Sequence, residues 1–318
     1  MNRLKKRFLK YEDMNIEIIR NEERVRSSLQ DFKIGEVLGQ GGFGTVYSGI
    51  EISTGVEFAL KEISIRAIRK EKKRSFEDPY LPFEIIALKQ LYGVDGVIKL
   101  FDWFYINQTI DSFKKGESQG DFIVACVIVL EKPEKCQDLF DYLTQNHPIG
   151  FETIKTIFKQ VIEISLACCD NEIYHRDLKD ENILIYGLGN GSGKELKIRL
   201  IDFGGAAFAQ EEPYTDFAGT IVFNPPEVFL KERYFGDKAT VWSLGILLYD
   251  MVFGDVPWQT KEEVIRGSLY FPESQKAMRG NNVTEYRKIT NLIQQCLSKK
   301  ENDRIDLKDI LKHKWFLD

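Results

Sequence analysis

Residues that commonly bind metals or form disulfides are scarce in this chain. Its 318 residues include three histidines and five cysteines. The cysteine count is odd, no CxxC pair occurs and Cys168 and Cys169 are adjacent, so the sequence predicts neither a structural zinc site nor a disulfide framework. Free thiols are the simpler interpretation, and they favour a reducing compartment.

Long hydrophobic runs and an excess of positive charge are also missing. No segment approaches the roughly 18 apolar residues that a membrane-spanning helix needs. Lys and Arg number 44 against 49 Asp and Glu, which argues against a general nucleic-acid-binding protein because such proteins need a basic surface. Hydrophobic residues make up 43% of the chain, which excludes disorder as the main state. The composition predicts a globular protein without a transmembrane segment or a nucleic-acid partner.

Residues 1–31 differ from the rest of the chain by their high charge. Leu4 and Phe8 stand one helical step apart among basic residues, as in a membrane-surface or nuclear-targeting patch. A solvated or loosely docked N-terminal extension is the plainer interpretation. No apolar region follows the basic start, so we expect no secretory signal. We expect a cytoplasmic protein, with the nucleus as a further location.

Short β-rich segments separated by glycines begin after this extension. Five of them read as antiparallel strands, and one segment at 83–91 has helical spacing. The stretch 107–121 between the last two strands is polar and contains glycine, so it is predicted to be a surface loop. The predicted strands are 34–39, 45–52, 56–63, 97–106 and 122–130.

After Pro133 the pattern becomes helical. Residues 182–187 and 196–204 read as a β-hairpin, and the remaining periodic segments read as helices. The predicted fold class is α+β and bilobal: a small five-stranded antiparallel β lobe with one main helix, and a larger α-helical lobe. A cleft between two such lobes is a natural ligand site. The predicted helices of the larger lobe are 152–169, 241–254, 286–297 and 307–313, the second of them apolar on nearly all sides.

A glycine-rich turn connects the first two predicted strands. Its glycines form a GxGxxG pattern, but a dinucleotide-binding fingerprint would lead into a helix, whereas the next segment is β-like. Glycines allow the backbone to lie close over phosphate groups. The pattern alone fits a nucleotide cover and an ordinary glycine hairpin about equally well. The glycines are Gly39, Gly41, Gly42 and Gly44.

A lysine stands among apolar residues of the third predicted strand. Lys61 follows Phe58–Leu60 and points either into a site or out to water. Glu84, on the following helix, is a candidate partner that would hold the ammonium group against phosphate oxygens. Each residue taken alone means little.

The segment His175–Asn182 is more specific. It supplies a carboxylate at Asp177, a lysine at Lys179 and an amide at Asn182. Phosphoryl transfer needs these groups: an acceptor for the hydroxyl proton, a cation for developing charge and an oxygen ligand for Mg²⁺. Asp202, in an Asp-Phe-Gly turn, supplies a second hard oxygen ligand of the sparse kind that Mg²⁺ prefers. A merely charged turn is the alternative.

These motifs, followed by Pro225–Glu227, occur in the order found in eukaryotic protein kinases. Residues 32–316 resemble that domain. The resemblance implies a small lobe at 32–130, a connector at 131–137 and a large lobe at 138–316.

The kinase resemblance implies ATP and Mg²⁺ as cofactors. By this resemblance Asp177 is the catalytic base, Lys179 stabilises the transferring phosphoryl group, and Lys61 binds the α- and β-phosphates. By the same resemblance Glu84 pairs with Lys61, and Asn182 and Asp202 bind Mg²⁺. The pair Glu227–Arg304 braces the activation segment.

Several segments are similar to the Pim serine/threonine kinases in particular. They include 130–141, 175–184 and 241–258. Most kinases bind adenine with a backbone N–H where Pro133 stands, and proline has none, so ATP would keep mainly the bond to the Glu131 carbonyl. The nucleotide-site residues implied are Leu38, Gly39, Gly41, Gly42, Gly44, Val46, Ala59, Lys61, Glu84, Glu131 and Pro133.

The Pim resemblance also implies activity without phosphorylation of the activation segment. In many kinases the arginine equivalent to Arg176 binds a phosphate, for which Tyr214, Thr215 and Thr220 are candidates. Thr220 is a poor one because the family uses its hydroxyl in the site. Glu211 and Glu212 are expected to give Arg176 a fixed negative partner.

The same resemblance points to basic protein substrates. A cluster of carboxylates in the peptide groove would attract arginines that precede the phosphorylated Ser or Thr, because the guanidinium fork bonds a carboxylate with two N–H groups. Ordinary solvated acids are the alternative. The implied substrate-site residues are Asp138, Asp141, Glu181, Asp250, Asp255 and Thr220.

An active serine/threonine kinase is therefore predicted, and a monomer. A pseudokinase is the main alternative, although Lys61, Asp177 and Asp202 are all present. A small-molecule kinase is disfavoured by the intact segment 202–227. The stretches 107–121 and 186–195 look longer than in the family and are interpreted as tolerated surface insertions.

Overall fold

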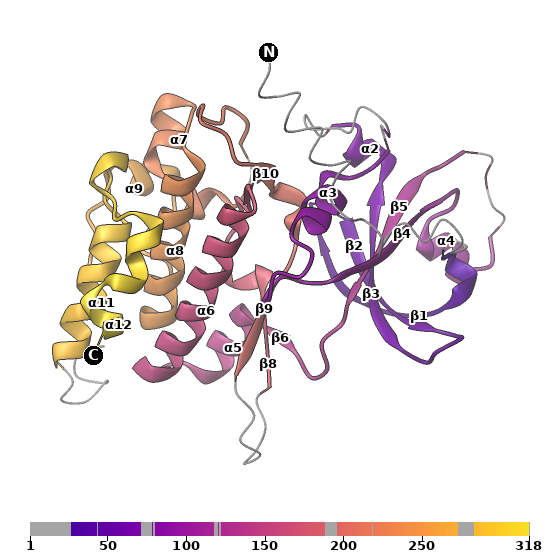
Figure 1. Ribbon diagram of the computed structural model, residues 1–318, viewed down its shortest axis with the longest axis horizontal. Helices are drawn as coiled ribbons and strands as arrows, with labels where there is room; N and C mark the ends of the chain where they lie inside the picture. The colour runs from indigo at the N-terminus through magenta and orange to yellow at the C-terminus, as the bar shows by residue number, and fades with distance from the viewer. Residues whose placement is uncertain are drawn as a thin grey trace.

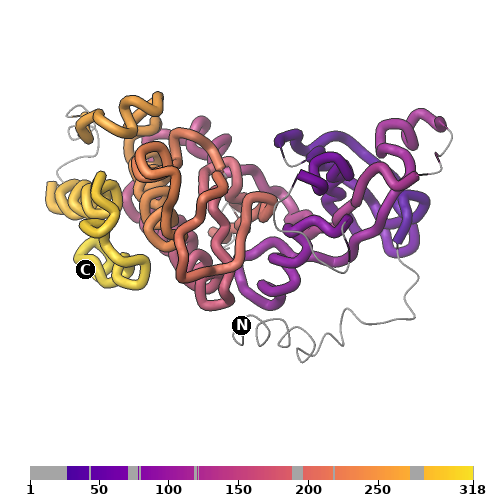
Figure 2. Tube along the Cα trace, turned by 90° about the horizontal axis from the view of Figure 1, so that it is seen from above, coloured from indigo at the N-terminus to yellow at the C-terminus, as the bar shows by residue number. Residues whose placement is uncertain are grey.

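The molecule consists of two lobes joined by a short connector (Figures 1 and 2). The N-terminal part forms a twisted β-sheet with few helices, and the C-terminal part is mainly helical. The computed structural model describes residues 27–42, 44–70, 78, 80–117, 120, 122–187, 196–217, 219–272 and 283–317.

The small lobe is built on one five-stranded antiparallel sheet. Its order is β1-β2-β3-β5-β4, so the last strand in sequence lies inside the sheet. Alternate residues of β5 point to opposite faces: Ile128 packs toward the helix and large-lobe side, and Val127 and Val129 pack into a second cluster on the outer side. Both faces are covered, which explains why this strand reads as a continuous apolar run. The strands are β1 (Phe32–Gly41), β2 (Gly44–Glu51), β3 (Glu57–Ser64), β4 (Leu100–Ile106) and β5 (Ala125–Glu131).

Three helices accompany this sheet. α3 (Phe83–Gln90) is the predicted main helix, and α2 (Ile65–Ile68) follows β3 directly. The stretch 107–121 is not simply the predicted loop, because it contains α4 (Ile110–Lys114), which is capped by the Thr109 side chain. Ile110 is completely buried in the outer cluster of the sheet. One well-placed apolar side chain therefore anchors a segment whose composition is mostly polar.

A few residues before β1 also belong to the small lobe. The Ser27 hydroxyl donates to the Asp102 carboxylate at 2.8 Å, and the Leu29 side chain is buried. Both precede residue 32, where the kinase resemblance begins. The rest of the predicted N-terminal extension lies outside the described residues.

The large lobe packs around two long helices. α8 (Gly236–Phe253) is buried on nearly all sides, as its sequence predicts, and α6 (Phe151–Asp170) buries one stripe. α8 also lies close to the helix that follows it in the core, since a Cβ on Gly245 would lie 2.7 Å from the Cys296 side chain. The other helices are α5 (Leu139–Asn146), α7 (Pro226–Lys231), α9 (Lys261–Arg266), α11 (Val283–Cys296) and α12 (Lys314–Leu317).

The predicted helix at 307–313 is a 3₁₀-helix, η6 (Leu307–Lys312). It buries Leu307 and Ile310, three residues apart, and this spacing suits the three-residue turn of a 3₁₀-helix.

Short strands between the helices hold the loops of the site. The predicted hairpin is present as β8 (Ile183–Tyr186) and β9 (Lys197–Leu200), with β6 (Gln137–Asp138) beside it. β7 (Ile173–Tyr174) pairs with β10 (Ala207–Phe208). Most of the predicted insertion at 186–195 lies outside the described residues.

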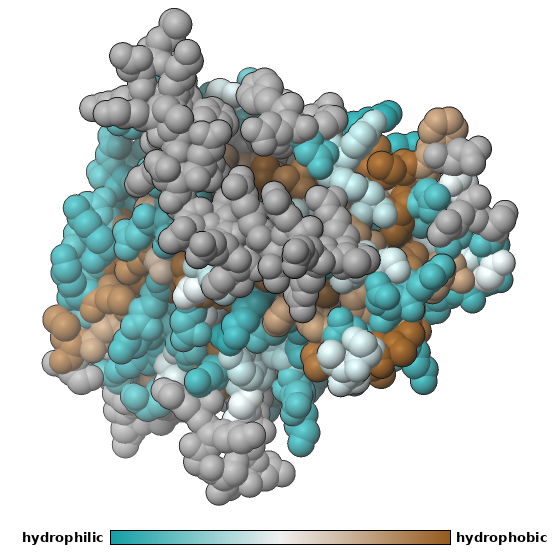
Figure 3. Space-filling model, turned by 45° about the vertical axis from the view of Figure 1, so that its right-hand side comes forward, coloured by the Kyte–Doolittle hydropathy of each residue, from teal (hydrophilic) through white to brown (hydrophobic). Residues whose placement is uncertain are grey.

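Hydrophilic side chains cover most of the described part of the face in Figure 3, with hydrophobic ones in separate patches. No helix within the described ranges is both long enough and apolar enough to cross a bilayer.

Candidate active site

The glycine-rich turn is a tight hairpin between β1 and β2, here called the phosphate hairpin (residues 39–46). Gly41 pairs with Gly44, and Gly44 has a φ of +132°. A Cβ on Gly44 would lie 2.3 Å from the Glu62 carbonyl oxygen, so this position requires glycine. A Cβ on Gly39 or Gly41 would meet nothing within 4 Å, which leaves the backbone there open to a ligand.

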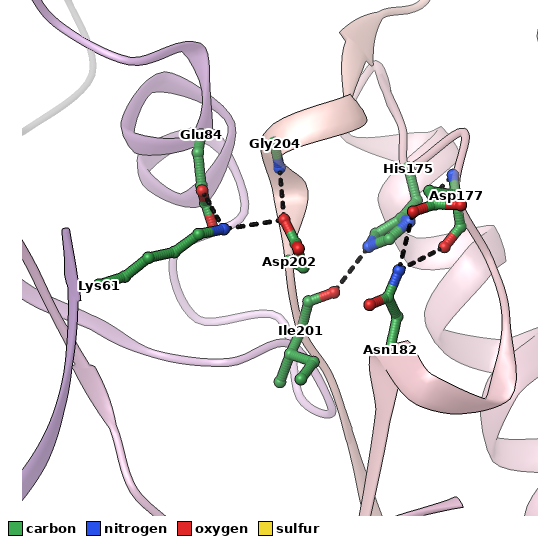
Figure 4. Close-up of polar contacts among 8 residues, drawn as sticks. All are labelled: Lys61, Glu84, His175, Asp177, Asn182, Ile201, Asp202 and Gly204. Carbon is green, nitrogen blue, oxygen red and sulfur yellow. Dashed lines mark hydrogen bonds and ion pairs between the residues drawn. The ribbon is translucent and has the colours of Figure 1, made fainter. Parts of the chain in front are cut away.

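Lys61 projects from β3 into the cleft between the lobes. Its Nζ lies 2.6 Å from Glu84 Oε2 on α3 and 2.8 Å from Asp202 Oδ1 in the large lobe (Figure 4). The Lys61 and Glu84 side chains are 4% and 1% exposed, so the ion pair is desolvated. Burial alone would lower the pKa of Lys61, but the two carboxylates raise it above its ordinary value. The lysine is therefore held charged, and it links the two lobes.

Asp202 occupies a strained turn. Its φ is +61°, and its Oδ1 accepts a hydrogen bond from the Gly204 N–H at 3.2 Å, which starts η3 (Phe203–Gly205). Burial would raise the pKa of the Asp202 carboxyl, but the Lys61 charge holds it below its usual range. The carboxylate is thus ionised and directed into the cleft.

Asp177 and Asn182 lie close together in the loop between β7 and β8. The Asn182 amide donates to the Asp177 carbonyl oxygen at 2.8 Å and to Asp177 Oδ2 at 3.1 Å (Figure 4). The backbone N–H of Thr220 donates to Asp177 Oδ1 at 3.0 Å. A Cβ on Gly219 would lie 2.7 Å from the Arg176 carbonyl oxygen, so glycine allows the activation segment to come this close.

His175 supports this loop from behind. Its Nε2 lies 2.9 Å from the Ile201 carbonyl oxygen, and its ring contacts the edge of the Phe203 ring at 4.7 Å between centroids. Burial lowers the pKa of His175, so the ring is neutral. It ties the segment before Asp177 to the segment before Asp202.

Arg176 has a fixed negative partner, but not the predicted one. Its Nη1 lies 3.0 Å from Asp216 Oδ2 and 3.1 Å from the Tyr234 hydroxyl. Glu211 and Glu212 are exposed, and no ion pair joins them to Arg176 among the described residues. Asp216 was missed because its partner is 40 positions away and only the path of the activation segment brings them together.

The candidate phosphorylation sites differ in access. Tyr214 is 2% exposed, its hydroxyl donates to the Phe208 carbonyl oxygen, and its ring lies against the Arg176 guanidinium. Thr220 contacts Asp177 through its backbone N–H, with its Oγ1 at 3.4 Å from Oδ1. Tyr214 is therefore a structural residue in this conformation.

The connector begins at the end of β5. Ala59 pairs with Leu130 across β3 and β5, and the Glu131 carboxylate accepts a hydrogen bond from Arg199 Nε at 3.1 Å. Pro133 is buried directly after this anchor. Leu38, in contrast, is 44% exposed on β1.

The predicted substrate acids fall into two neighbouring groups. Asp138 Oδ1 caps α5 by accepting the Asp141 N–H at 2.7 Å, and Glu181 forms an ion pair with Lys179. Burial raises the pKa of Asp138, and the charges of Asp141 and Glu181 raise it further.

The second group surrounds Asp250. Burial raises the pKa of Asp250 to about 7, with additional contributions from Asp180 and Asp255. Asp180 was not predicted. Burial raises its pKa and the Glu181 charge raises it further, while Asp180 in turn acts on Asp250, so this buried acid neighbours both groups. Together we call these acids the acidic cluster: Asp138, Asp141, Asp180, Glu181, Asp250 and Asp255.

Glu227 and Arg304 form the predicted pair. Two parallel contacts of 2.6 Å join the guanidinium to the carboxylate, and both side chains are buried. The contact is bidentate and fixes α7 to the C-terminal part of the chain.

The side-chain oxygens of Asn182 and Asp202 suit a metal ion that takes its remaining ligands from a bound nucleotide and water. Among the described residues, no three His, Cys, Asp or Glu side chains converge as a complete metal site. Asn182 turns its amide nitrogen to Asp177, which leaves its oxygen for another ligand, and Asp202 is partly exposed at 28%. Mg²⁺ binds through one or two such groups plus phosphates and water, so these residues fit it.

Comparison with known proteins agrees with this geometry. The protein kinase domain family matches residues 32–316. The chain is 36% identical over 310 residues to the serine/threonine-protein kinase pim-2 of Danio rerio, covering 95% of this chain and 90% of that protein. It is 32% identical over 304 residues to the serine/threonine-protein kinase prk-2 of Caenorhabditis elegans, covering 95% of this chain and 62% of that protein. The chain belongs to the protein kinase family, as a serine/threonine kinase related to the Pim kinases.

Proposed function

We propose that this kinase transfers the γ-phosphoryl group of ATP to Ser or Thr in arginine-rich sequences, and that it needs no phosphorylation of its own activation segment. The arrangement of Asp177 supports this most directly. Its carboxylate accepts hydrogen bonds from Asn182 and Thr220, the Lys61–Glu84 pair is formed within the small lobe, and Lys61 reaches Asp202 across the cleft.

Asp177 is the group that accepts the hydroxyl proton as the substrate oxygen attacks the γ-phosphorus. Lys61 holds the α- and β-phosphates, and Glu84 positions Lys61. Lys179, two residues after the base, compensates charge on the transferring group once the Glu181 contact is exchanged for phosphate. The bond from γ-phosphorus to the bridging oxygen breaks, and ADP leaves.

Asn182 and Asp202 would hold Mg²⁺ beside the phosphates. When bound, the ion offsets the negative charge of the nucleotide. The Asn182 contact with Asp177 couples the position of this metal ligand to that of the base. Glycines 39, 41 and 42 leave the hairpin backbone open above the phosphates.

The acidic cluster supports the preference for arginine. The charges of Asp141 and Glu181 act on Asp138, and those of Asp180 and Asp255 act on Asp250, so each of these two carboxylates has acidic neighbours. Neighbouring carboxylates bind a guanidinium more strongly than isolated ones, because it neutralises their mutual repulsion.

The Arg176–Asp216 pair supports activity without activation-segment phosphorylation. A carboxylate already occupies the position next to Arg176 where a phosphate would bind. Arg176 Nε also donates to the Gly205 carbonyl oxygen at 2.8 Å, directly after the Asp202 turn. The pair therefore ties the activation segment to the segment that positions Asp202.

One experiment tests both parts of this proposal. Phosphatase-treated protein is assayed with ATP, Mg²⁺ and two Ser peptides, one with arginines before the serine and one with glutamines there. We expect activity on the arginine peptide alone, and at least tenfold loss in Asp216→Asn with little loss in Glu211→Gln. Inactive dephosphorylated protein, or equal use of both peptides, would contradict the proposal.

We also propose a monomer that works in the cytoplasm and the nucleus. Sedimentation of the purified protein and imaging of the tagged full chain test these two points.

A further inference from the structure

A pocket of about 810 Å³ opens beside the catalytic loop, and none of the residues of the acidic cluster lines it. Both lobes line it. The small lobe contributes Gly42 in the phosphate hairpin and Arg66 on α2, and the large lobe contributes Gly219 and Ile221 of the activation segment. In Figure 1, α2 and α7 lie in the upper part of the molecule, and α5 and β6, which carry Asp138 and Asp141 of the acidic cluster, lie in the lower part.

We propose that this upper pocket binds the part of a protein substrate that follows the phosphorylated Ser or Thr, and that it selects acidic side chains there. The inference rests on the proposed function and specifies the substrate of the same site further.

The pocket opens next to the segment of the chain that contacts Asp177. Thr220 donates its backbone N–H to Asp177, and its two neighbours, Gly219 and Ile221, both line the pocket. A substrate hydroxyl that reaches Asp177 is therefore next to the mouth of the pocket. If the arginines before the hydroxyl lie on the acidic cluster, the chain after the hydroxyl continues on the opposite side, into the pocket.

Basic side chains outnumber acidic ones in the lining of the pocket. Arg66 and Lys70 line the small-lobe side and are exposed, and Lys261 lines the large-lobe side, with its Nζ 5.3 Å from the centre of the Phe229 ring. Arg176 also lines the pocket, but it is paired with Asp216. Among the lining residues that the structure describes, Glu232 is the one acid besides Asp216.

The pocket thus has a net positive lining, opposite in sign to the acidic cluster. Apolar side chains stand between the cations, with Phe217 55% and Ile221 60% exposed. A flank that contains Glu or Asp beside an apolar residue complements both features. A substrate that is basic before the acceptor and acidic after it would be fixed in one direction across Asp177.

The test uses two peptides with the same arginines before the serine. One has two Glu among the second to fourth residues after the serine, and the other has Gln at the same positions. We expect the Glu peptide to have a kcat/KM higher by roughly two- to fivefold per acid, mainly through KM, because exposed charge pairs contribute modestly. Added salt should reduce the difference.

Variants assign the effect to the pocket. The double variant Arg66→Gln/Lys70→Gln should abolish the preference for the Glu peptide and leave the kcat/KM for the Gln peptide unchanged. Lys159 is an exposed cation on α6 and serves as the control, so Lys159→Gln should keep the preference. Binding of both peptides to the Asp177→Asn protein, followed by fluorescence polarisation, should show the same order without turnover.

The outcomes separate this inference from the proposed function. Equal use and equal binding of the two peptides, or a preference that survives the double variant, would overturn the inference alone. Failure to phosphorylate either arginine peptide would overturn the proposed substrate class and this inference with it.

Discussion

The carboxyl group of Asp177 shows how single residues determine the chemistry of this site. One oxygen accepts from Asn182 and the other from the Thr220 N–H, and these donors fix the carboxylate plane. The two contacts reach Asp177 from Asn182 of its own loop and from the activation segment. Under the proposed function, a change at this one side chain would affect proton transfer and leave Lys61 in place.

Asp177→Asn should lower kcat by at least 10²-fold while ATP affinity stays within about twofold, because a general base contributes roughly 10²–10⁴-fold and the amide keeps the shape. Rapid-quench kinetics and calorimetric ATP titration measure the two quantities. Near wild-type turnover would show that another group accepts the proton.

Asp250 should make the binding of arginine peptides depend on pH. Its pKa is about 7, so the carboxyl gains its charge between pH 6 and 8 and attracts a guanidinium better at the higher pH. The KM for an arginine peptide should fall over this range, and Asp250→Asn should flatten the profile. The same slope in the variant would assign the dependence to another group.

Rising pH should lower the stability of the folded protein through Asp250, although it improves the binding of arginine peptides. The folded-state pKa lies above the ordinary value of 3.8, so the folded protein binds the proton more tightly than the unfolded chain. The stabilisation is complete below pH 3.8 and is lost as pH rises to about 7. Chemical denaturation should therefore show that Asp250→Asn gains stability relative to the wild type as pH rises from 5 to 8.

At the scale of elements, α4 on the outer side of the small-lobe sheet contacts β1 and β2, the strands that carry the phosphate hairpin. Lys114 Nζ donates to the Gly35 carbonyl oxygen of β1 at 2.9 Å, and the Ile110 N–H donates to the Glu62 carboxylate of β3 at 3.2 Å. Lys114 also lies 5.9 Å from the centre of the Tyr47 ring of β2. The helix thus contacts the two strands of the hairpin and the strand that bears Lys61.

Lys114→Ala should raise the KM for ATP by about two- to tenfold with little change in kcat, because it removes one charge-assisted hydrogen bond to β1. Lys115→Ala is the matched control, as Lys115 is the neighbouring exposed cation at the end of α4. Hydrogen exchange of residues 34–47 should rise in the first variant alone. Identical kinetics in both variants would mean that α4 does not position the hairpin.

At the scale of the whole molecule, Arg304 joins parts of the large lobe that are far apart in sequence. It pairs with Glu227 on α7, donates to the Lys238 carbonyl oxygen at 3.1 Å and to the Ser298 carbonyl oxygen at 3.0 Å, and lies over the Trp242 ring. The end of the activation segment, the start of α8 and the C-terminal segment therefore meet at one guanidinium.

Glu227→Ala should lower the free energy of unfolding by about 3–5 kcal/mol, because it leaves the Arg304 charge buried without its carboxylate. Asp309→Ala, which breaks the exposed pair with Lys312, is the control and should have a much smaller effect. Thermal and urea unfolding of both variants measure the difference. Equal destabilisation would contradict a special role for the buried pair.

Much of the fold was predictable, and the errors have physical causes. β-rich segments and helical spacing located all five small-lobe strands, α3, α6 and α8, and among them β5, α6 and α8 carry many buried apolar residues. α4 was missed because its single turn has one fully buried anchor, Ile110, in a polar stretch. The segment 307–313 was assigned to an α-helix because two apolar residues three apart fit either helix type.

The chain order of the motifs by itself determined the protein kinase family, since that order does not depend on how the lobes pack. Contacts between residues distant in sequence depended on tertiary structure. Asp216 rather than Glu211 or Glu212 meets Arg176, and Asp180 is buried beside Asp250, because the paths of the activation segment and of α8 decide which charges face each other. Ion pairs have no sequence periodicity, so a pair that no known motif carries, such as Arg176–Asp216, becomes visible only in the folded chain.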